Sequence, residues 1–457
     1  MIHLAEHAPA GPGLATLASL PLTAAQKYYY PLLTDNECAP AFLSMFMISE
    51  GVRIQPGVSA RRLQRALKRL VARHDVLRLR FVEQGGQVRA HLAPEASVEL
   101  NVRDYGQTSY EDMLRICSDL VAEPMDVTAP LQSAFHLLRF AELGDVILIR
   151  LNHIITDAYG ATILAEDLIK LFLGLPLGGS GLSHIDYLNE FEAKLPPYEG
   201  QVRAYWEELL ANPPQPWLPT TGHSCSASAI PLHQVRETSQ YSLNLAADDT
   251  TRLVERCKAN EATVYTAAVA ALAEVLEERS GLNDIIGRNV LARSQGTLSN
   301  YVGFCVQFPF FRMRVEDGDT ILERAAAFRK QLQNTLQYPS IATASPGGVI
   351  EESLVAARGV GAELFAHLAA ADGRSKSSPF RALFRTAGGA PIQLGPATIE
   401  RMPFVRTPAV DLSADIHLLI VPFEETTTFK MCCDPARRSS AELEEISTEM
   451  AEKLRRV

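Results

Sequence analysis

The sequence predicts a mixed α/β protein with two lobes. Its 457 residues exceed the usual size of one domain, and either half could bury a hydrophobic core of its own. Strand and helix patterns also alternate along the chain. An apolar strand at 146–151 leads to a helical pattern at 163–172, and helical patterns within 253–279 lead to a strand at 284–286. Both halves of the chain are therefore expected to contain strands and helices.

The composition is that of an ordinary globular protein, with 47% hydrophobic and 21% charged residues. A formal net charge of −10 argues against a general nucleic-acid binder. The seven cysteines are an odd number without metal-ligand spacing, which predicts reduced thiols, no metal site and a cytoplasmic protein. The N-terminus lacks the features of a signal peptide, and no run reaches the roughly 18 apolar residues of a membrane helix.

Composition along the chain predicts its division into lobes. The Ala/Gly/Pro-rich residues 1–18 are expected to form a loose leader, and the Gly-rich stretch at 174–183 marks a flexible break. The predicted N-terminal lobe is therefore 19–178, and the C-terminal lobe is 179–457. Within the second lobe, 341–378 is Ala-rich and expected to be mostly helical. The last helix is expected to begin at Ser439 or Ser440 as its cap.

One further helix is predicted at 58–74, with opposite apolar and basic faces. Its apolar residues recur at helical spacing, and six Arg and Lys residues fill the other face. Two interpretations of the basic face stay open. It could meet an acidic partner, or it could be a solvated face that balances the charge of an acidic protein.

The residues at 148–160 are the strongest candidates for chemistry. The strand ends at the polar pair Asn152 and His153, and Asp157 lies just before the next helical pattern. A histidine at a strand end is held by rigid backbone and titrates near neutral pH, which suits a general base. Such a histidine can equally be a core or capping residue, so the residue type alone does not decide.

The sequence NHIITDA at 152–158 resembles the HHxxxDG signature of condensation domains of nonribosomal peptide synthetases, in the chloramphenicol-acetyltransferase-like superfamily. His153 matches the second histidine and Asp157 the aspartate, whereas Asn152 and Ala158 depart from the pattern. Other motifs resemble the family's in the same order, from about residue 21 to the C-terminus: TAAQKYYY at 23–30, RHDVLRLRF at 73–81, DY at 186–187, YW at 205–206, GRNVLAR at 287–293, VGFCVQFP at 302–309, LQYP at 336–339 and DL at 411–412.

The resemblance implies a specific architecture. It consists of two chloramphenicol-acetyltransferase-like lobes, each an α+β sandwich, arranged in a V with the active site in a tunnel between them. A latch-like crossover is expected to reach from the C-terminal lobe to the N-terminal lobe. His153, as the counterpart of the catalytic histidine, is expected midway along the tunnel.

The resemblance also assigns supporting roles. Asp157 could complete a catalytic His–Asp pair, but the family's aspartate points away from the substrate and pairs with an arginine, here Arg293. Asn152 could orient His153 or contact the intermediate, because an asparagine both donates and accepts hydrogen bonds. The candidates for lining the tunnel are Ala158, Tyr159, Gly303 and Gln307.

The implied function is that of a free-standing condensation enzyme in natural-product biosynthesis. It would transfer an acyl group from a carrier-protein phosphopantetheine thioester to an amine or hydroxyl, forming an amide or ester. No cofactor of its own is expected, since phosphopantetheine arrives on the carrier. The expected partners are an acyl- or peptidyl-carrier donor and a carrier-bound or free acceptor, with no nucleic acid and no membrane, and the protein is expected to be a monomer.

Two alternatives remain open at this point. One is an epimerisation-type domain of the same fold, which inverts an α-carbon. The other is a non-catalytic docking domain that recruits a partner enzyme. The retained His153 argues against docking, while Asn152 and Ala158 leave it open.

Overall fold

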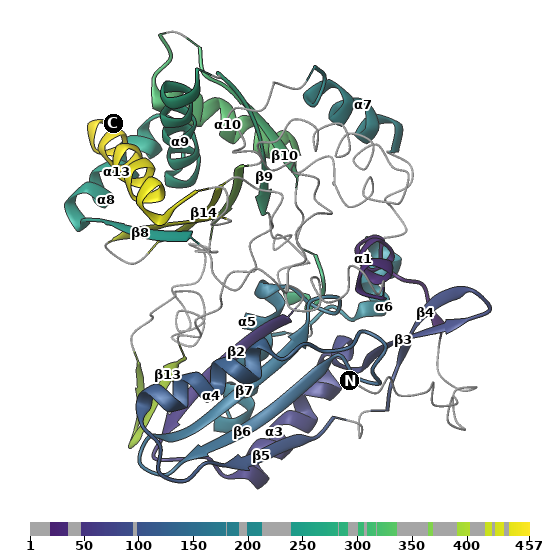
Figure 1. Ribbon diagram of the computed structural model, residues 1–457. Coiled ribbons are helices and arrows are strands. Elements are labelled where there is room, and N and C mark those ends of the chain that lie inside the picture. Colours follow the sequence, from purple (N-terminus) through teal and green to yellow (C-terminus); the bar gives the residue numbers. More distant parts are fainter. Residues whose placement is uncertain are drawn as a thin grey trace, which may run out of the picture.

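The computed structural model shows a mixed α/β protein with two lobes (Figure 1), as the sequence predicts. The structure describes residues 19–34, 47–94, 98–179, 181–191, 199–212, 239–281, 283–290, 300–305, 309–316, 318–335, 364–368, 391–402, 416–422, 426–433 and 438–457. Among these residues, none of the helices is both long enough and apolar enough to span a membrane.

The N-terminal lobe is built on a six-stranded sheet. Its strands, in spatial order, are β12 (Ile392–Leu394), β13 (Ala397–Arg401), β2 (Met47–Gln55), β7 (Gly144–Asn152), β6 (Ser133–Phe140) and β5 (Leu100–Asp104). All neighbouring pairs are antiparallel except β5 and β6. Strand β7 is buried along its whole length, which explains its nearly continuous apolar sequence.

Helices cover both faces of this sheet. Alternate residues of β7 point to opposite faces, and apolar side chains on both faces pack against these helices. Ile147, Ile149 and Leu151 join the core under α3 (Ala60–Arg73) and α5 (Ala158–Leu173). Val146 and Leu148 pack instead with α4 (Tyr110–Ala122). The predicted strand and the helix after it are both confirmed.

Helix α3 confirms the prediction of an amphipathic helix before residue 74. Ser59 caps it by accepting a hydrogen bond from the Arg62 backbone N–H at 3.4 Å. Its apolar residues are buried, and its basic residues from Arg61 to Arg69 are exposed. Burial of the apolar face against α5 and the sheet therefore holds the helix, and the cations stay in solvent.

A small second sheet and three further helices belong to the described part of this lobe. The sheet has the order β1 (Ser19–Leu20), β4 (Gln87–Leu92) and β3 (Leu79–Gln84). Helix α1 (Ala24–Thr34) begins at Thr23, and the 3₁₀ helix η2 (Asp75–Arg78) follows α3. Helix α6 (His184–Glu190) follows the predicted lobe boundary in sequence, yet its Tyr187 and Leu188 pack in the N-terminal core.

The C-terminal lobe contains a second six-stranded sheet. Its order is β10 (Phe310–Arg314), β9 (Asp284–Val290), β11 (Leu364–Leu368), β14 (Ile416–Pro422), β15 (Thr427–Cys433) and β8 (Ser239–Leu245). Four helices share one core with this sheet: α8 (Ala247–Ala259), α9 (Val264–Ser280), α10 (Ile321–Thr335) and α13 (Ser440–Arg456). On the other face, Trp206 of α7 (Glu199–Leu209) packs against Ile286 and Phe310. The two helices and the strand predicted at 253–286 are confirmed.

Strand β11 corrects one prediction. The segment 341–378 was expected to be mostly helical, but Leu364–Leu368 is a strand that pairs in parallel with both β9 and β14. A short apolar run fits a buried strand as well as a buried helix, and pairing on both sides decides between them. The remainder of 341–378 lies outside the described residues.

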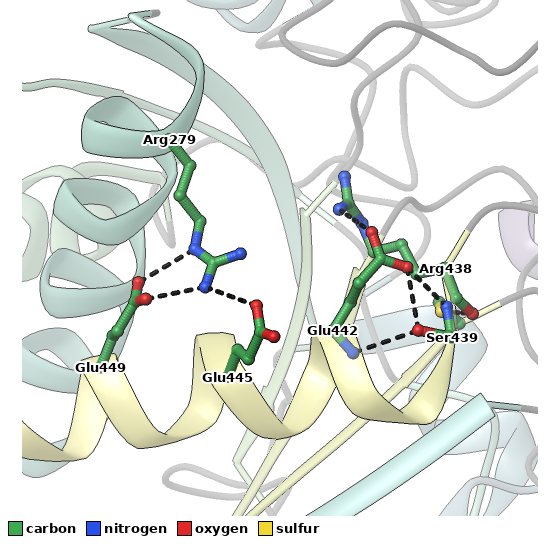
Figure 2. Close-up of polar contacts among 7 residues, drawn as sticks. Arg279, Arg438, Ser439, Glu442, Glu445 and Glu449 are labelled. Carbon is green, nitrogen blue, oxygen red and sulfur yellow. Dashed lines mark hydrogen bonds and ion pairs between the residues drawn. The ribbon is translucent and has the colours of Figure 1, made fainter.

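The last helix, α13, shows how polar groups fasten an element to the C-terminal lobe (Figure 2). Ser439 caps it, and the Glu442 carboxylate accepts a hydrogen bond from the Ser439 backbone N–H in a reciprocal capping box. The Arg279 guanidinium of α9 donates hydrogen bonds to Glu449 and Glu445 of α13. The predicted start of this helix is confirmed.

Strands β12 and β13 lie far along the chain but extend the N-terminal sheet at its edge (Figure 1). Strand β13 pairs with β2, and two ion pairs accompany the backbone ladder. Arg401 contacts the buried Glu50 carboxylate at 2.8 Å, and Arg53 contacts Glu400 at 2.5 Å. The chain therefore crosses back to the N-terminal lobe before it completes the C-terminal sheet.

Candidate functional site

His153 is the first residue after β7, on a tight turn that leads to α5. The Ile155 N–H donates to the Asn152 carbonyl, and the Thr156 N–H donates to the His153 carbonyl, both at 3.2 Å. Two consecutive backbone bonds thus fix the turn at the end of a buried strand. His153 is half-buried as a residue, and the Nδ1 atom of its ring is buried.

Asn152 lies beneath this turn and is fully buried. Its side-chain oxygen accepts a hydrogen bond from the Ile154 N–H at 3.1 Å, and its amide group donates to the Met125 carbonyl at 3.4 Å. Both ends of the amide are therefore occupied by backbone. This geometry favours a role in orienting the turn over contact with an intermediate.

Asp157 joins the turn to the start of α5. One carboxylate oxygen accepts the Gly160 N–H at 2.9 Å, which caps the helix, and the other accepts the Cys305 N–H at 3.0 Å. The Asp157 N–H also donates to the Gly303 carbonyl at 3.2 Å. Asp157 thus ties two chain segments together, in keeping with the structural role expected of it. Its predicted partner Arg293 lies outside the described residues.

Phe304 is a neighbour of His153 that sequence reasoning missed. The centroids of the two rings lie 4.6 Å apart at an interplanar angle of 56°. Tyr29 of α1 also packs against Phe304, with the two ring centroids 5.4 Å apart. One wall beside the imidazole is therefore aromatic, formed by segments more than a hundred residues away in sequence.

Gln26 holds the turn through a hydrogen bond, and sequence reasoning also missed it as a site residue. Its side-chain amide donates to the Ile154 carbonyl at 3.2 Å. Its position is fixed by a capping box, because the Thr23 hydroxyl accepts a hydrogen bond from the Gln26 backbone N–H and the Gln26 side-chain Oε1 accepts one from the Thr23 backbone N–H. The Thr-x-x-Gln spacing was a signal for the cap, but no local pattern indicates its contact with Ile154.

The other predicted site residues are only partly placed. Ala158 is exposed and Tyr159 half-buried, both in the first turn of α5. Gly303 is buried, and its peptide contacts Asp157. Gln307 lies outside the described residues, as Arg293 does. The structure therefore brings His153, Asn152, Asp157 and Gly303 together, whereas the predicted lining of a tunnel stays a prediction.

A pocket with a volume of ≈ 770 Å³ lies apart from this turn, among α7, β10 and α10. Its lining mixes cations and carboxylates. The buried Arg312 is bound to Asp284 and to the carbonyls of Leu209 and Ala211, so its charge holds the end of α7 in place. The turn at His153 is therefore the better candidate for a reactive site.

Comparison with known proteins decides the family. A sequence model of the condensation domain matches residues 18–342, which is most of the chain. The chain belongs to the condensation-domain family. Condensation domains of nonribosomal peptide synthetases are acyltransferases that form amide bonds, and relatives of this chain occur in synthetases that build natural products.

One curated relative of this condensation domain is surfactin synthase subunit 1 from Bacillus subtilis (strain 168). It is 26% identical over 291 residues, which cover 63% of this chain and 8% of the synthase. A second is the phosphinothricin tripeptide synthetase PhsC from Streptomyces viridochromogenes, 24% identical over 305 residues, covering 64% of this chain and 28% of the synthetase. The chain thus spans a small part of the length of these relatives.

Solved structures share the fold along nearly the whole chain. The starter condensation domain of the rhizomide synthetase RzmA, solved with C8-CoA, superposes with a TM-score of 0.69 at 16% identity, covering 96% of this chain and 94% of that one. The X-domain from teicoplanin biosynthesis, in complex with OxyB, gives 0.71 at 18% identity, covering 99% and 96%. At these identities the superpositions establish the fold alone.

Proposed function

We propose that this condensation domain catalyses acyl transfer from a carrier-bound thioester to an amine, with His153 as the group that handles the proton. The observation that carries the proposal is the position of His153, half-exposed on a turn that backbone bonds and the Asn152 amide hold rigid. An imidazole held in a fixed position is a suitable group for proton transfer. We propose further that the enzyme acts as a free-standing protein and needs no cofactor of its own.

In the proposed mechanism, the protein forms no covalent bond with the acyl group. The acceptor nitrogen attacks the thioester carbonyl, and His153 takes the proton that the nitrogen loses. The carbon–sulfur bond then breaks, and the departing carrier thiolate receives that proton from His153. Holding both substrates beside the imidazole removes much of the entropy cost of a bimolecular step. Phe304 and Tyr29 contribute an aromatic wall beside His153, which keeps water from one side of the ring.

The choice of acceptor has a testable physical basis. An α-amino group has a pKa of about 7.7–8.0, so a useful fraction is neutral near pH 7.5, and a base is needed only to take the proton that the nitrogen loses after it attacks. A hydroxyl needs a base to take its proton as it attacks. Asn152 cannot titrate, so it offers no second base beside His153. We therefore expect amide formation to exceed ester formation.

The experiment offers matched amine and alcohol acceptors to the wild-type protein and to His153→Ala at several pH values. We expect faster turnover of the amine by the wild type, and a larger proportional loss with the alcohol in the variant. A strong wild-type preference for the alcohol would mean that the enzyme forms esters rather than amides. No reaction with any carrier-bound donor would favour the docking function, in line with the likeness to an X-domain solved with OxyB.

The exposed basic face of α3 gives a prediction about the carrier protein. Arg61, Arg62, Arg65, Lys68 and Arg69 are exposed, and none has an ion-pair partner among the residues that the structure describes. Exposed ion pairs are individually weak, but a patch of cations can steer an acidic partner. Reversing Arg62, Arg65 and Arg69 to glutamate is expected to raise the KM for an acidic carrier at low salt and to leave kcat unchanged.

The control for this prediction reverses three exposed cations of the other lobe, Arg256, Lys258 and Lys330, and so makes the same change in net charge. Equal effects of the two triple variants would mean that net charge alone matters. An unchanged KM for the α3 variant at low salt would assign the basic face to solvent.

A further inference from the structure

Residues 301–305 leave the C-terminal lobe to pack against the N-terminal lobe. In sequence they lie between β9 and β10, two paired strands of the C-terminal sheet. In space, Tyr301, Val302, Phe304 and Cys305 belong to the hydrophobic core of the N-terminal lobe. Whatever holds this segment therefore also holds Phe304 against the His153 ring.

Tyr301 is the most firmly held member of the segment. It is buried, and its hydroxyl lies 2.8 Å from the Nδ1 atom of His184. Its ring stacks on Tyr187 with a centroid distance of 4.5 Å and an interplanar angle of 7°. Both partners belong to α6, and the His184 ring is also stacked near Tyr301 with a centroid distance of 6.5 Å, so a hydrogen bond and aromatic stacking dock Tyr301 on that helix.

His184 is itself anchored to the N-terminal lobe. It is the first residue of α6 and only 1% exposed. Its backbone N–H donates to both carboxylate oxygens of Asp75, each at 3.0 Å. Burial lowers the pKa of His184 to about 4, so its imidazole is neutral near pH 7 and can share a hydrogen bond with a hydroxyl.

The Tyr301 ring is in direct contact with the backbone that continues to Phe304. A Cβ atom placed on Gly303 would lie 2.2 Å from the Cε1 atom of Tyr301, so the ring packs closely on this glycine. The Gly303 carbonyl accepts the Asp157 N–H, and the Cys305 N–H donates to the Asp157 carboxylate. Asp157 thus binds the backbone on both sides of Phe304, at Gly303 and at Cys305, and the Tyr301 ring packs on Gly303.

We infer that His184 and Tyr301 are positioning residues for the proposed acyl transfer. Their hydrogen bond fixes the segment 301–305 on the N-terminal lobe and so sets the position of Phe304 beside the His153 imidazole. Neither residue contacts the reacting atoms. Loss of the bond leaves His153 in place but allows its aromatic wall to shift, which alters both the environment of the imidazole and the space for the acceptor.

The first test removes a single atom. Tyr301→Phe deletes the hydroxyl and keeps the ring on Tyr187 and Gly303. We expect kcat to fall by about 10- to 100-fold, the range for a displacement on the order of 1 Å at a reaction site. We also expect the His153 ring signals in ¹H–¹³C NMR spectra to move, because the ring current of Phe304 shifts with its position. The matched control is Tyr205→Phe, which removes a hydroxyl that lies 2.8 Å from Thr335 Oγ1 in the C-terminal lobe.

Further variants test whether the loss of kcat arises from the hydrogen bond between His184 and Tyr301 and acts through Phe304. His184→Leu should reproduce Tyr301→Phe, whereas His184→Gln, which can still hydrogen-bond the hydroxyl, should restore much of the rate. The double variant of His184→Leu and Tyr301→Phe should be no slower than either single variant, since both remove one bond. In a Phe304→Ala background, Tyr301→Phe should cause no additional loss of kcat.

The NMR measurement separates this inference from the proposed function, because it needs no substrate. Signals of His153 that move in Tyr301→Phe and stay fixed in Tyr205→Phe would support the positioning role, even if no acyl donor reacts. If Tyr301→Phe only lowers the Tm, as Tyr205→Phe does, with unchanged His153 signals and kcat, the hydrogen bond is merely structural and the inference is overturned.

Discussion

Replacement of His153 by alanine is expected to lower kcat for acyl transfer by about 10²–10⁴-fold, the usual cost of removing a general base. The fold should survive, since His153 is half-buried on a turn that backbone bonds hold. The measurement is the rate of product formation from a carrier-bound donor at saturating acceptor, together with the Tm of each protein.

The pH profile provides the control for this prediction. The wild-type kcat should rise with pH as the base loses its proton, and the alanine variant should lack this limb. A His153→Ala protein with the wild-type Tm and full turnover would remove His153 from the chemistry.

Replacement of Asp157 by alanine is expected to lower the free energy of unfolding by about 2–5 kcal/mol. The variant loses the cap of α5, which costs about 0.5–2 kcal/mol, and a charged acceptor for the Cys305 N–H, which costs about 1.5–3 kcal/mol. Asp157→Asn keeps an oxygen for the cap and should lose less. The measurement is chemical denaturation of each variant.

The control for Asp157 is Ser109→Ala, which removes only the cap of α4, where the Ser109 hydroxyl accepts the Asp112 N–H at 3.0 Å. The Asp157 variant should lose clearly more stability. Equal losses would mean that the tie to the segment 301–305 contributes nothing. The proposed ion pair with Arg293 adds a second check, because paired residues should give strongly non-additive losses when both are replaced.

Local patterns of the sequence were sufficient for much of the fold. The apolar run of β7, the cap at Ser439 and the helical periodicity of α5 each depend on residues within one element, so the local sequence is enough to predict them. The order of strand, histidine, aspartate and helix likewise located the turn at His153. Strand β11 shows the limit, since its apolar run fits a strand or a helix until its neighbours are known.

The surroundings of His153 could not be predicted in this way. Phe304, Tyr29 and Gln26 reach the turn from segments far away in sequence, and no periodicity marks a contact between such segments. His184 is a similar case. A histidine at the start of a helix does not indicate a hydrogen bond to Tyr301, which lies in sequence between two strands of the C-terminal lobe. These contacts arise from tertiary packing, and they place an aromatic wall beside the imidazole.

The most direct test of the proposed function is a single-turnover reaction followed by intact-protein mass spectrometry. Equimolar protein, acyl-loaded carrier and an amine acceptor are mixed, and the mass of the carrier is followed with time. We predict that the acyl mass leaves the carrier and appears in an amide product with the wild type, and that His153→Ala slows this transfer by at least about 10²-fold. An acyl group that stays on the carrier with every donor and acceptor tried, or that leaves equally fast with His153→Ala, would contradict the assignment.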